Sequence, residues 1–248
     1  MTITIPPDIS ALLREATRVT VLTGAGISAE SGIPTFRDAM TGLWAKFRPD
    51  ELATVEAFRR NPSLVWQWYA ERRARVAEAV PNAGHHALVA MEARVPQFAL
   101  YTQNVDGLHA RAGSKSLYEL HGNLTRVKCI DCDAPALSWD SEASPPQCAR
   151  CGGDLRPDVV WFGEMLPEET LAAAWRAAET CDVFVSVGTS NAVQPAASLP
   201  WHAAAHGATV LVVNPTAEGQ QTGPRIHHLL GPAGTVLPAL VAAAWPTP

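Results

Sequence analysis

Two pairs of cysteines constrain the fold of this chain more than any other feature. Cys129 and Cys132 form one C-x-x-C pair, and Cys148 and Cys151 form a second pair after fifteen intervening residues. Four thiolates at this spacing can close a tetrahedral zinc site. A redox dithiol is the alternative, but two pairs at ribbon-like spacing favour zinc. Because all four ligands would be protein sulfurs, we expect the metal to stabilise a small lobe and to take no part in chemistry.

A glycine turn follows a short β-branched run near the N-terminus. Residues 19–23 read as a buried strand, Gly24 and Gly26 follow it, and a helix is expected to start near Ser28. With Ala29, the turn fits G-x-G-x-x-[GA], in which missing side chains let the backbone approach a pyrophosphate. A plain turn is the alternative. The acidic residue that usually follows a second strand has no counterpart, which disfavours a hydride-transfer enzyme.

Three later runs have the same buried-strand character, at residues 98–102, 183–187 and 209–213. Alanine-rich amphipathic segments at 168–180 and 196–206 are candidate crossover helices. Near-continuous apolar strands are typical of a parallel sheet covered on both faces. The predicted fold is therefore α/β.

Two stretches interrupt this alternation, a helical one rich in tryptophan and arginine and the one that holds the cysteine pairs. We expect them to combine into a second, smaller zinc-binding and helical domain beside a Rossmann-like parallel-sheet domain. The predicted boundaries are 1–42, 84–123 and 156–248 for the Rossmann-like domain, and 43–83 and 124–155 for the small domain.

Composition excludes several classes of protein. The chain has 248 residues, of which 47% are hydrophobic and 17% charged, so a large core is expected and disorder is not. Its net charge of −5 argues against nucleic acid as a partner. No apolar segment approaches the roughly 20 residues that span a bilayer, and no signal sequence is visible, so a cytoplasmic protein without a membrane partner is expected. The oligomeric state is not set by the sequence, which is compatible with a monomer.

Three further motifs carry a family resemblance. Residues 24–37, residues 102–109 and residues 119–123 match, in order, the three signatures of the sirtuin family. The cysteine pairs follow the third signature as they do in that family. The chain thus resembles a sirtuin over nearly its whole length, which implies an NAD-dependent protein-lysine deacylase with NAD⁺ as co-substrate and one structural Zn²⁺.

The resemblance also implies roles for individual residues. In the family's reaction the acyl oxygen of a modified lysine attacks the nicotinamide ribose, nicotinamide leaves, and the acyl group moves to ADP-ribose. His121 is then the base that removes a ribose hydroxyl proton, which an imidazole does well near neutral pH. Asn104 orients ribose and water. The implied NAD contacts are Gly24, Ala25, Gly26, Ser28, Thr35, Phe36, Arg37, Gln103, Asn104, Val105, Asp106, His121, Gly188, Thr189, Ser190, Asn214 and Ala233.

The same resemblance implies a substrate site between the domains. An acylated-lysine peptide would add as a strand between two loops, contacting Val160, Phe162, Gly163 and Glu164 on one side and Val193 on the other. Tyr69 and Arg72 are three residues apart on a helix and share a face. Taken alone this is a solvated face; within the family it resembles the class III pattern, in which the pair binds the carboxylate of a succinyl or malonyl chain. Ala39 matches the small residue that leaves room for that chain.

Two other functions use some of the same residues. The NAD site could serve NAD hydrolysis or ADP-ribosyl transfer, with water or another nucleophile capturing the ribose. The cysteines could instead belong to a zinc-ribbon binding module without catalysis, which leaves His121, Asn104 and Asp106 unexplained.

Overall fold

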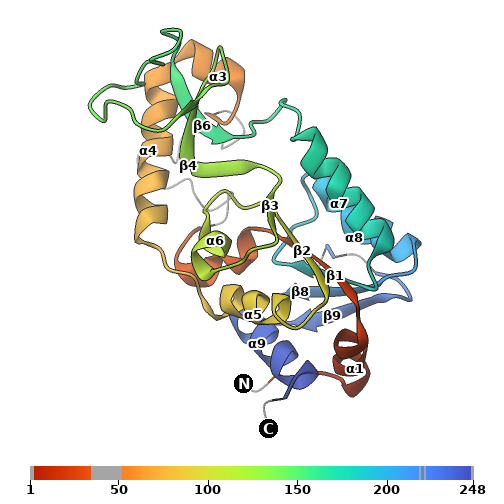
Figure 1. The fold of residues 1–248 in the computed structure, drawn as a ribbon. Coiled ribbons are helices and arrows are strands. Elements are labelled where there is room, and N and C mark those ends of the chain that lie inside the picture. Colours follow the sequence, from red (N-terminus) through yellow and green to blue (C-terminus); the bar gives the residue numbers. More distant parts are fainter. Residues whose placement is uncertain (1–2, 35–51, 218, 221, 247–248) are drawn as a thin grey trace.

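The computed structural model describes residues 3–34, 52–217, 219–220 and 222–246. A six-stranded sheet of parallel neighbours forms its centre, in the order β3-β2-β1-β7-β8-β9 (Figure 1). The strands are β1 (Arg18–Thr23), β2 (Gln97–Thr102), β3 (Leu117–Glu119), β7 (Val183–Val187), β8 (Thr209–Asn214) and β9 (Ile226–Leu230). The strand order reverses between β1 and β7. In open α/β sheets ligands bind beside such a point, outside the carboxyl ends of the strands.

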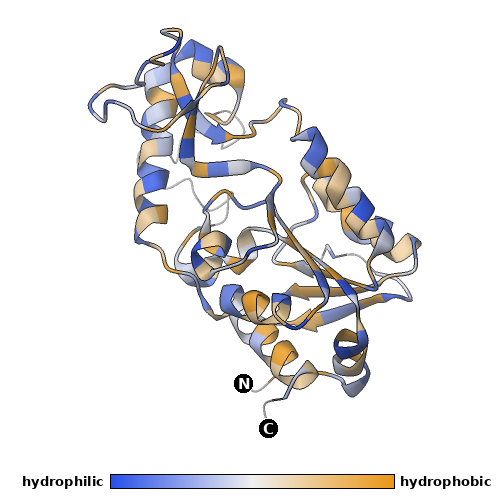
Figure 2. Cartoon of the chain, viewed as in Figure 1, coloured by the Kyte–Doolittle hydropathy of each residue, from blue (hydrophilic) through white to orange (hydrophobic). Residues whose placement is uncertain are grey.

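Helices cover both faces of this sheet. One face carries α1 (Pro7–Glu15), α5 (Ala83–Glu92) and α9 (Ala233–Ala244), and the other carries α7 (Glu168–Thr180) and α8 (Leu199–Ala205) (Figure 1). Side chains alternate between the faces: Val183 and Val185 pack in the first core, and Phe184 packs in the second. The inner strands are accordingly mostly apolar (Figure 2). The α/β prediction is confirmed.

A smaller antiparallel sheet lies beyond the carboxyl edge. Its order is β5-β4-β6, formed by β4 (Gly122–Cys129), β5 (Pro135–Ala136) and β6 (Leu155–Val159). Two helices accompany it, α3 (Val55–Arg60) and α4 (Pro62–Glu78) (Figure 1). Phe58, Trp68, Leu124 and Trp161 share one buried cluster. Residues of the two predicted insertions thus pack together, but Trp161 and most of β6 belong to the segment 156–248 that was assigned to the Rossmann-like domain. The domain boundaries therefore stay a prediction.

The structure differs from the expected helix pattern near the N-terminus. Where a helix was expected from Ser28, two single 3₁₀ turns occur instead, Ala25–Ile27 and Ala29–Ser31. Gly32 ends the second turn with φ at 78°, in the left-handed region that glycine tolerates. The predicted helix 168–180 is confirmed as α7. The one expected at 196–206 begins as a 3₁₀ turn, Ala196–Ser198, and becomes α8 at Leu199.

The remaining short helix, α6 (Leu108–Ala112), joins β2 to β3. Over the part of the chain that the structure describes, no helix combines the length and apolarity needed to cross a membrane.

Two buried histidines lie between α5 and α6. His85 accepts a hydrogen bond from the Asn82 backbone N–H, 3.2 Å away, through Nδ1. Nε2 of His109 is 2.9 Å from Thr23 Oγ1, and the two imidazole rings are 4.8 Å apart. Burial lowers the pKa of His85 to about 4 and that of His109 to about 3, and a neighbouring histidine adds to each shift. Both side chains are therefore neutral in the folded protein.

This pair predicts acid sensitivity. Below pH 6.5 the unfolded chain binds protons on both histidines that the folded chain excludes, so the free energy of unfolding falls from pH 6.5 toward pH 4. In His85→Gln the new side chain keeps an acceptor for the Asn82 N–H at this capping position but does not titrate. Between pH 7.5 and 5.5 the variant should lose about 1 kcal/mol less stability than the wild type. Urea unfolding at the two pH values measures this difference; equal losses would contradict the assignment.

Candidate active site

Two glycine turns meet at the point where the strand order reverses. The Gly24 N–H donates to the Val187 carbonyl, and the Gly26 N–H donates to the Gly188 carbonyl, each over 2.9 Å. A Cβ on Gly26 would lie 2.6 Å from Gly188 Cα, closer than any side chain tolerates, and Gly188 has φ at 61°. The glycines are thus required for backbone packing between the turns after β1 and β7.

Three polar side chains gather beside these turns. Nδ2 of Asn104 donates to the Gly24 carbonyl (3.1 Å) and to Ser28 Oγ (3.2 Å). The Ser28 hydroxyl donates to Asp106 Oδ2 over 2.7 Å, and Asp106 Oδ1 accepts the Leu108 N–H over 2.9 Å. All three side chains are buried. Burial raises the pKa of Asp106, against the hydrogen bonds from Leu108 and Ser28, which lower it. The first two sequence signatures therefore meet in one network.

His121 lies between β3 and β4, with its ring held by the backbone. Nδ1 is 3.0 Å from the Gln103 carbonyl oxygen. Since a carbonyl can only accept, the neutral ring carries its hydrogen on Nδ1 and has its lone pair on Nε2. Burial lowers the pKa of His121, and the Gln103 bond offsets this only in part. A neutral imidazole with a fixed tautomer is suited to accept a proton.

The turns after β7 and β8 lie at the same carboxyl edge of the sheet. Asn214 Nδ2 donates to the Thr189 carbonyl over 2.9 Å. Ser190 is exposed, as a ligand contact requires. The side chain of Ala233, by contrast, is buried in the core at the start of α9.

Two residues at this turn escaped the sequence prediction. The Thr189 hydroxyl donates to Asn191 Oδ1 over 2.9 Å, and Asn191 Nδ2 donates to Gln220 Oε1 over 2.8 Å. Asn191 has φ at 54°, which asparagine tolerates better than most residues. For Asn191, its place in a loop two residues after Thr189 could have indicated a role at this turn. Nothing in the sequence indicated Gln220.

The loop expected to meet the substrate is held by its own side chains. The Glu164 carboxylate accepts bonds from Arg156 Nη2 (2.8 Å) and from the Trp161 N–H (2.7 Å). The Val160 N–H donates to the His121 carbonyl over 2.9 Å, which ties the loop to the candidate base. Phe162 projects outward with 43% of its surface exposed. Glu164 is therefore engaged within the loop, whereas the Phe162 side chain is partly exposed.

Val193 lies on the loop between β7 and α8 and is 39% exposed. Gly163 has φ at 87°, so it allows a sharp turn directly after Phe162.

Tyr69 and Arg72 occupy one face of α4, as their spacing predicts. Trp161 Nε1–H donates to Tyr69 Oη over 2.9 Å, so the phenol keeps its own hydrogen to donate elsewhere. Burial raises the pKa of Tyr69 to about 12. Arg72 Cζ lies 5.0 Å from the centre of the Trp68 ring, and burial lowers the pKa of Arg72, with Tyr69 opposing the shift. A guanidinium group that is shielded from water and lies beside a hydroxyl donor favours the binding of an anion.

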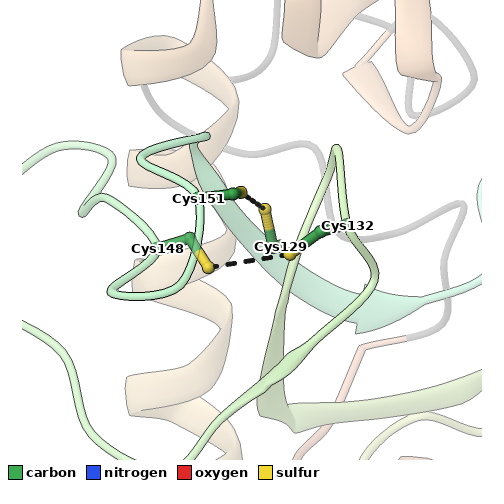
Figure 3. A group of neighbouring side chains, drawn as sticks. All are labelled: Cys129, Cys132, Cys148 and Cys151. Atoms are coloured by element: carbon green, nitrogen blue, oxygen red, sulfur yellow. Dashed lines mark hydrogen bonds between the residues drawn. The ribbon is translucent and has the colours of Figure 1, made fainter.

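The four predicted zinc ligands converge in the small domain (Figure 3). Sγ of Cys129 is 3.5 Å from that of Cys151, and Sγ of Cys132 is 3.8 Å from that of Cys148. Tetrahedral Zn–S bonds of about 2.3 Å place sulfurs about 3.8 Å apart, and all four cysteines are free of disulfides. The donors therefore fit one Zn²⁺.

Backbone N–H groups donate to the sulfurs of this cluster and so stabilise negatively charged thiolates. Asp131 and Arg150 donate to the sulfurs of Cys129 and Cys148, each over 3.4 Å. The N–H groups of Arg150 and Cys151 lower the pKa of Cys148 to about 7. For Cys151 the Gly153 N–H acts in the same direction, but the adjoining sulfurs and burial outweigh it and raise the pKa to about 12. A divalent cation removes this conflict between neighbouring thiolates.

Four of the predicted site residues, Thr35, Phe36, Arg37 and Ala39, lie outside the described part of the chain.

Comparison with known proteins agrees with this arrangement. A model of the Sir2 family matches residues 24–195. An NAD-dependent protein deacylase of Ralstonia nicotianae is 53% identical over 96% of this chain and 96% of its own length. NAD-dependent protein deacylase 1 of Pseudomonas aeruginosa is 50% identical over 95% of this chain and 97% of its own.

Two solved structures extend the comparison to three dimensions. A Sir2 homologue in complex with NAD has a TM-score of 0.90 at 42% identity, over 98% of this chain and 95% of that one. A Sir2 protein bound to an acetylated peptide has a TM-score of 0.82 at 28% identity, over 95% and 96%. Fold and site define a nucleotide-binding α/β protein with a cysteine-built metal module. Because the family model covers more than half of the chain, the chain belongs to the Sir2 family.

The cysteine geometry predicts a structural role for the metal. Cys151→Ala should purify without zinc and lose the packing of the β4–β6 sheet, since the site contributes folding energy to a small lobe. A loss of several kcal/mol should lower the thermal midpoint by on the order of 10 °C. Metal analysis and near-ultraviolet circular dichroism, which detects the Trp66–Trp139 pair, measure both effects.

Cys181→Ala is the matched control, because Cys181 is buried beside α7 outside the cluster. It should keep one zinc per chain. A zinc-free Cys151→Ala protein with an unchanged midpoint would contradict the structural role.

Proposed function

We propose that this protein is an NAD-dependent protein-lysine deacylase that removes acetyl groups, and also succinyl or malonyl groups, from lysine side chains. The products are free lysine, nicotinamide and O-acyl-ADP-ribose. The observation that carries the proposal is the fixed tautomer of His121: the Gln103 carbonyl, directly before Asn104 in the chain, holds Nδ1–H and leaves the lone pair on Nε2. The deacylase names of the relatives support the same activity.

The dinucleotide is assigned to the carboxyl edge of the parallel sheet. When bound, NAD⁺ supplies an electrophilic ribose carbon with nicotinamide as the leaving group. We assign the residues around the turns after β1, β2, β7 and β8 to its binding, including Gly24 to Ser28, Gln103 to Asp106, Gly188 to Ser190, and Asn214. The location agrees with the general rule for open α/β sheets. The solved Sir2 homologue in complex with NAD supports NAD as the ligand. Thr35, Phe36 and Arg37 are proposed to complete the site.

Within this site the chain's residues divide the work. His121 accepts a ribose hydroxyl proton on Nε2 while Gln103 holds Nδ1–H. Asn104 is fixed by two donated bonds and keeps its amide oxygen to orient a hydroxyl or a water. Asp106, held by Ser28 and Leu108, offers a rigid carboxyl group to the nicotinamide amide.

The substrate is proposed to be an acylated-lysine peptide that pairs its backbone with Val160 to Gly163 on one side and with Val193 on the other. The Sir2 protein with an acetylated peptide supports a substrate of this kind. Glu164 contributes by fixing the loop through Arg156. The net charge of −5 favours protein over nucleic-acid partners, and we propose a cytoplasmic location.

Acyl selectivity is proposed to rest on Tyr69 and Arg72, with Ala39 leaving room for the chain. Trp161 occupies the lone-pair side of the Tyr69 oxygen, which leaves the hydroxyl hydrogen for a terminal carboxylate. Arg156 in turn stacks on the Trp161 ring, with Cζ 3.4 Å from the ring centre. The guanidinium of Arg72 supplies charge in a desolvated site, where an ion pair is strong.

The proposed base predicts a specific loss. His121→Ala should reduce deacylation by 10²-fold or more, because removal of a general base typically costs about 10²–10⁴. In the wild type the acid limb of kcat/KM should have its midpoint below pH 6.5, because burial lowers the pKa of His121 and protonation on Nε2 removes the lone pair. Turnover of an acetyl-lysine peptide from pH 5 to 8 measures both.

His86→Ala is the control, because His86 is exposed on α5. It should keep wild-type turnover. Near-normal activity of a folded His121→Ala protein would refute the role of His121.

The acyl pocket predicts a selective loss. Arg72→Met should lower succinyl-lysine turnover by on the order of 10²-fold, because a desolvated carboxylate loses its charged partner. Acetyl-lysine turnover should change little. Arg75→Met, an exposed substitution on the same helix, should affect neither substrate. Equal loss on both peptides in Arg72→Met would show that Arg72 is structural.

A further inference from the structure

A second group of possible metal ligands lies far from the cysteines in the fold, where α7 and α8 pack together (Figure 1). It consists of Glu179 near the end of α7, His202 within α8, and His206 directly after α8. One ligand atom from each of the three residues lies within 4.8 Å of the other two. The group takes no part in the proposed chemistry.

The two histidines are presented in a defined way. They are four residues apart, which places both rings on one side of α8, with centroids 4.2 Å apart. Nδ1 of His206 is 2.8 Å from the His202 carbonyl oxygen. Because that oxygen only accepts, His206 carries its hydrogen on Nδ1 and has the Nε2 lone pair directed away from the helix. A backbone carbonyl commonly fixes metal-binding histidines in this way.

The first histidine is already placed against the carboxylate. Nε2 of His202 is 3.0 Å from Glu179 Oε1, and the His202 ring packs edge-on against Trp175 with centroids 4.7 Å apart. With metal bonds of about 2.1 Å, this N···O distance corresponds to an angle of about 90° at an ion between the two atoms. Two ligands of one ion are about 4.2 Å apart when they lie opposite each other and about 3.4 Å apart at the tetrahedral angle. The widest separation, within 4.8 Å, must therefore close by about 0.6 to 1.4 Å, depending on the geometry of the ion.

The simpler interpretation is a hydrogen-bonded His–Glu pair next to a helix end. That interpretation accounts for Glu179 and His202 but gives the Nε2 lone pair of His206 no role. Two imidazole nitrogens and one carboxylate oxygen are the donor set that zinc, nickel and copper prefer. We propose that Glu179, His202 and His206 form a binding site for a divalent first-row transition metal ion that joins α7 to α8.

The site differs in kind from the cysteine cluster. Three protein ligands leave coordination positions to water, and Glu179 and His202 are partly exposed at 43% and 27%. Binding is therefore weaker and more readily exchanged than binding to four thiolates. Since only the folded chain brings α7 and α8 together, bound metal should stabilise the folded state.

The test uses the full-length chain without an affinity tag, with its cysteine cluster loaded with zinc. Isothermal titration with Ni²⁺ should show one saturable equivalent, and the thermal midpoint should rise with Ni²⁺ concentration. Zinc content measured after the titration shows whether the cysteine cluster kept its metal. His206→Ala should weaken Ni²⁺ binding by at least tenfold and abolish the rise in midpoint.

Two further variants separate ligation from folding. Glu179→Gln keeps an oxygen that can accept a hydrogen bond from His202 but loses the charge, so it should also weaken Ni²⁺ binding. His86→Ala removes an exposed histidine elsewhere and should bind Ni²⁺ as the wild type does. The proposal is overturned if the zinc-loaded wild type takes up no Ni²⁺, or if folded His206→Ala and Glu179→Gln bind it with unchanged affinity.

Discussion

The contact between the turns after β1 and β7 is the constraint on which the candidate site depends. The Gly26 N–H donates to the Gly188 carbonyl, and the two backbones are so close that neither glycine position could carry a side chain. This contact joins the two halves of the sheet where the strand order reverses, and it places Ser28 next to Asn104 and Asp106. The glycine motif therefore has a packing cause that exists before any ligand binds. Any phosphate binding at these turns would use a geometry that the fold already requires.

Burial determines the chemical state of the polar groups around this contact. His121 and the His85–His109 pair are all kept neutral by desolvation, yet of these three rings only His121 is held through Nδ1–H by a backbone carbonyl, which leaves the lone pair on Nε2. The same cause keeps the Tyr69 hydroxyl protonated. In the proposed acyl pocket the charge is that of Arg72, since a guanidinium remains ionised even when buried. The proposed reaction thus needs a neutral base and a charged group that binds the acyl carboxylate. A histidine, His121, provides the first, and an arginine, Arg72, provides the second.

Much of this could be predicted from the sequence because the signals are local. Four strands of the parallel sheet (β1, β2, β7 and β8), α7 and the four cysteines follow from periodicity and spacing, and the sirtuin resemblance gathered Asn104, Asp106 and His121. The edge strands β3 and β9 were not predicted. Tertiary contacts decided the rest. The helix expected from Ser28 became two 3₁₀ turns ending at Gly32. The bond between Asn191 and Gln220 joins residues 29 positions apart, and the support of Tyr69 by Trp161 spans 92 positions. No pattern in the sequence marks such pairings.

The proposed active site couples the release of nicotinamide to the removal of an acyl group from lysine. The most direct measurement is mass-spectrometric turnover of matched succinyl-lysine and acetyl-lysine peptides, with and without NAD⁺, with nicotinamide quantified in the same reactions. The account predicts that free lysine and nicotinamide appear in equal amounts, only with NAD⁺, and that succinyl is removed at least as readily as acetyl. Nicotinamide release without any deacylated peptide would contradict the account and indicate NAD⁺ hydrolysis.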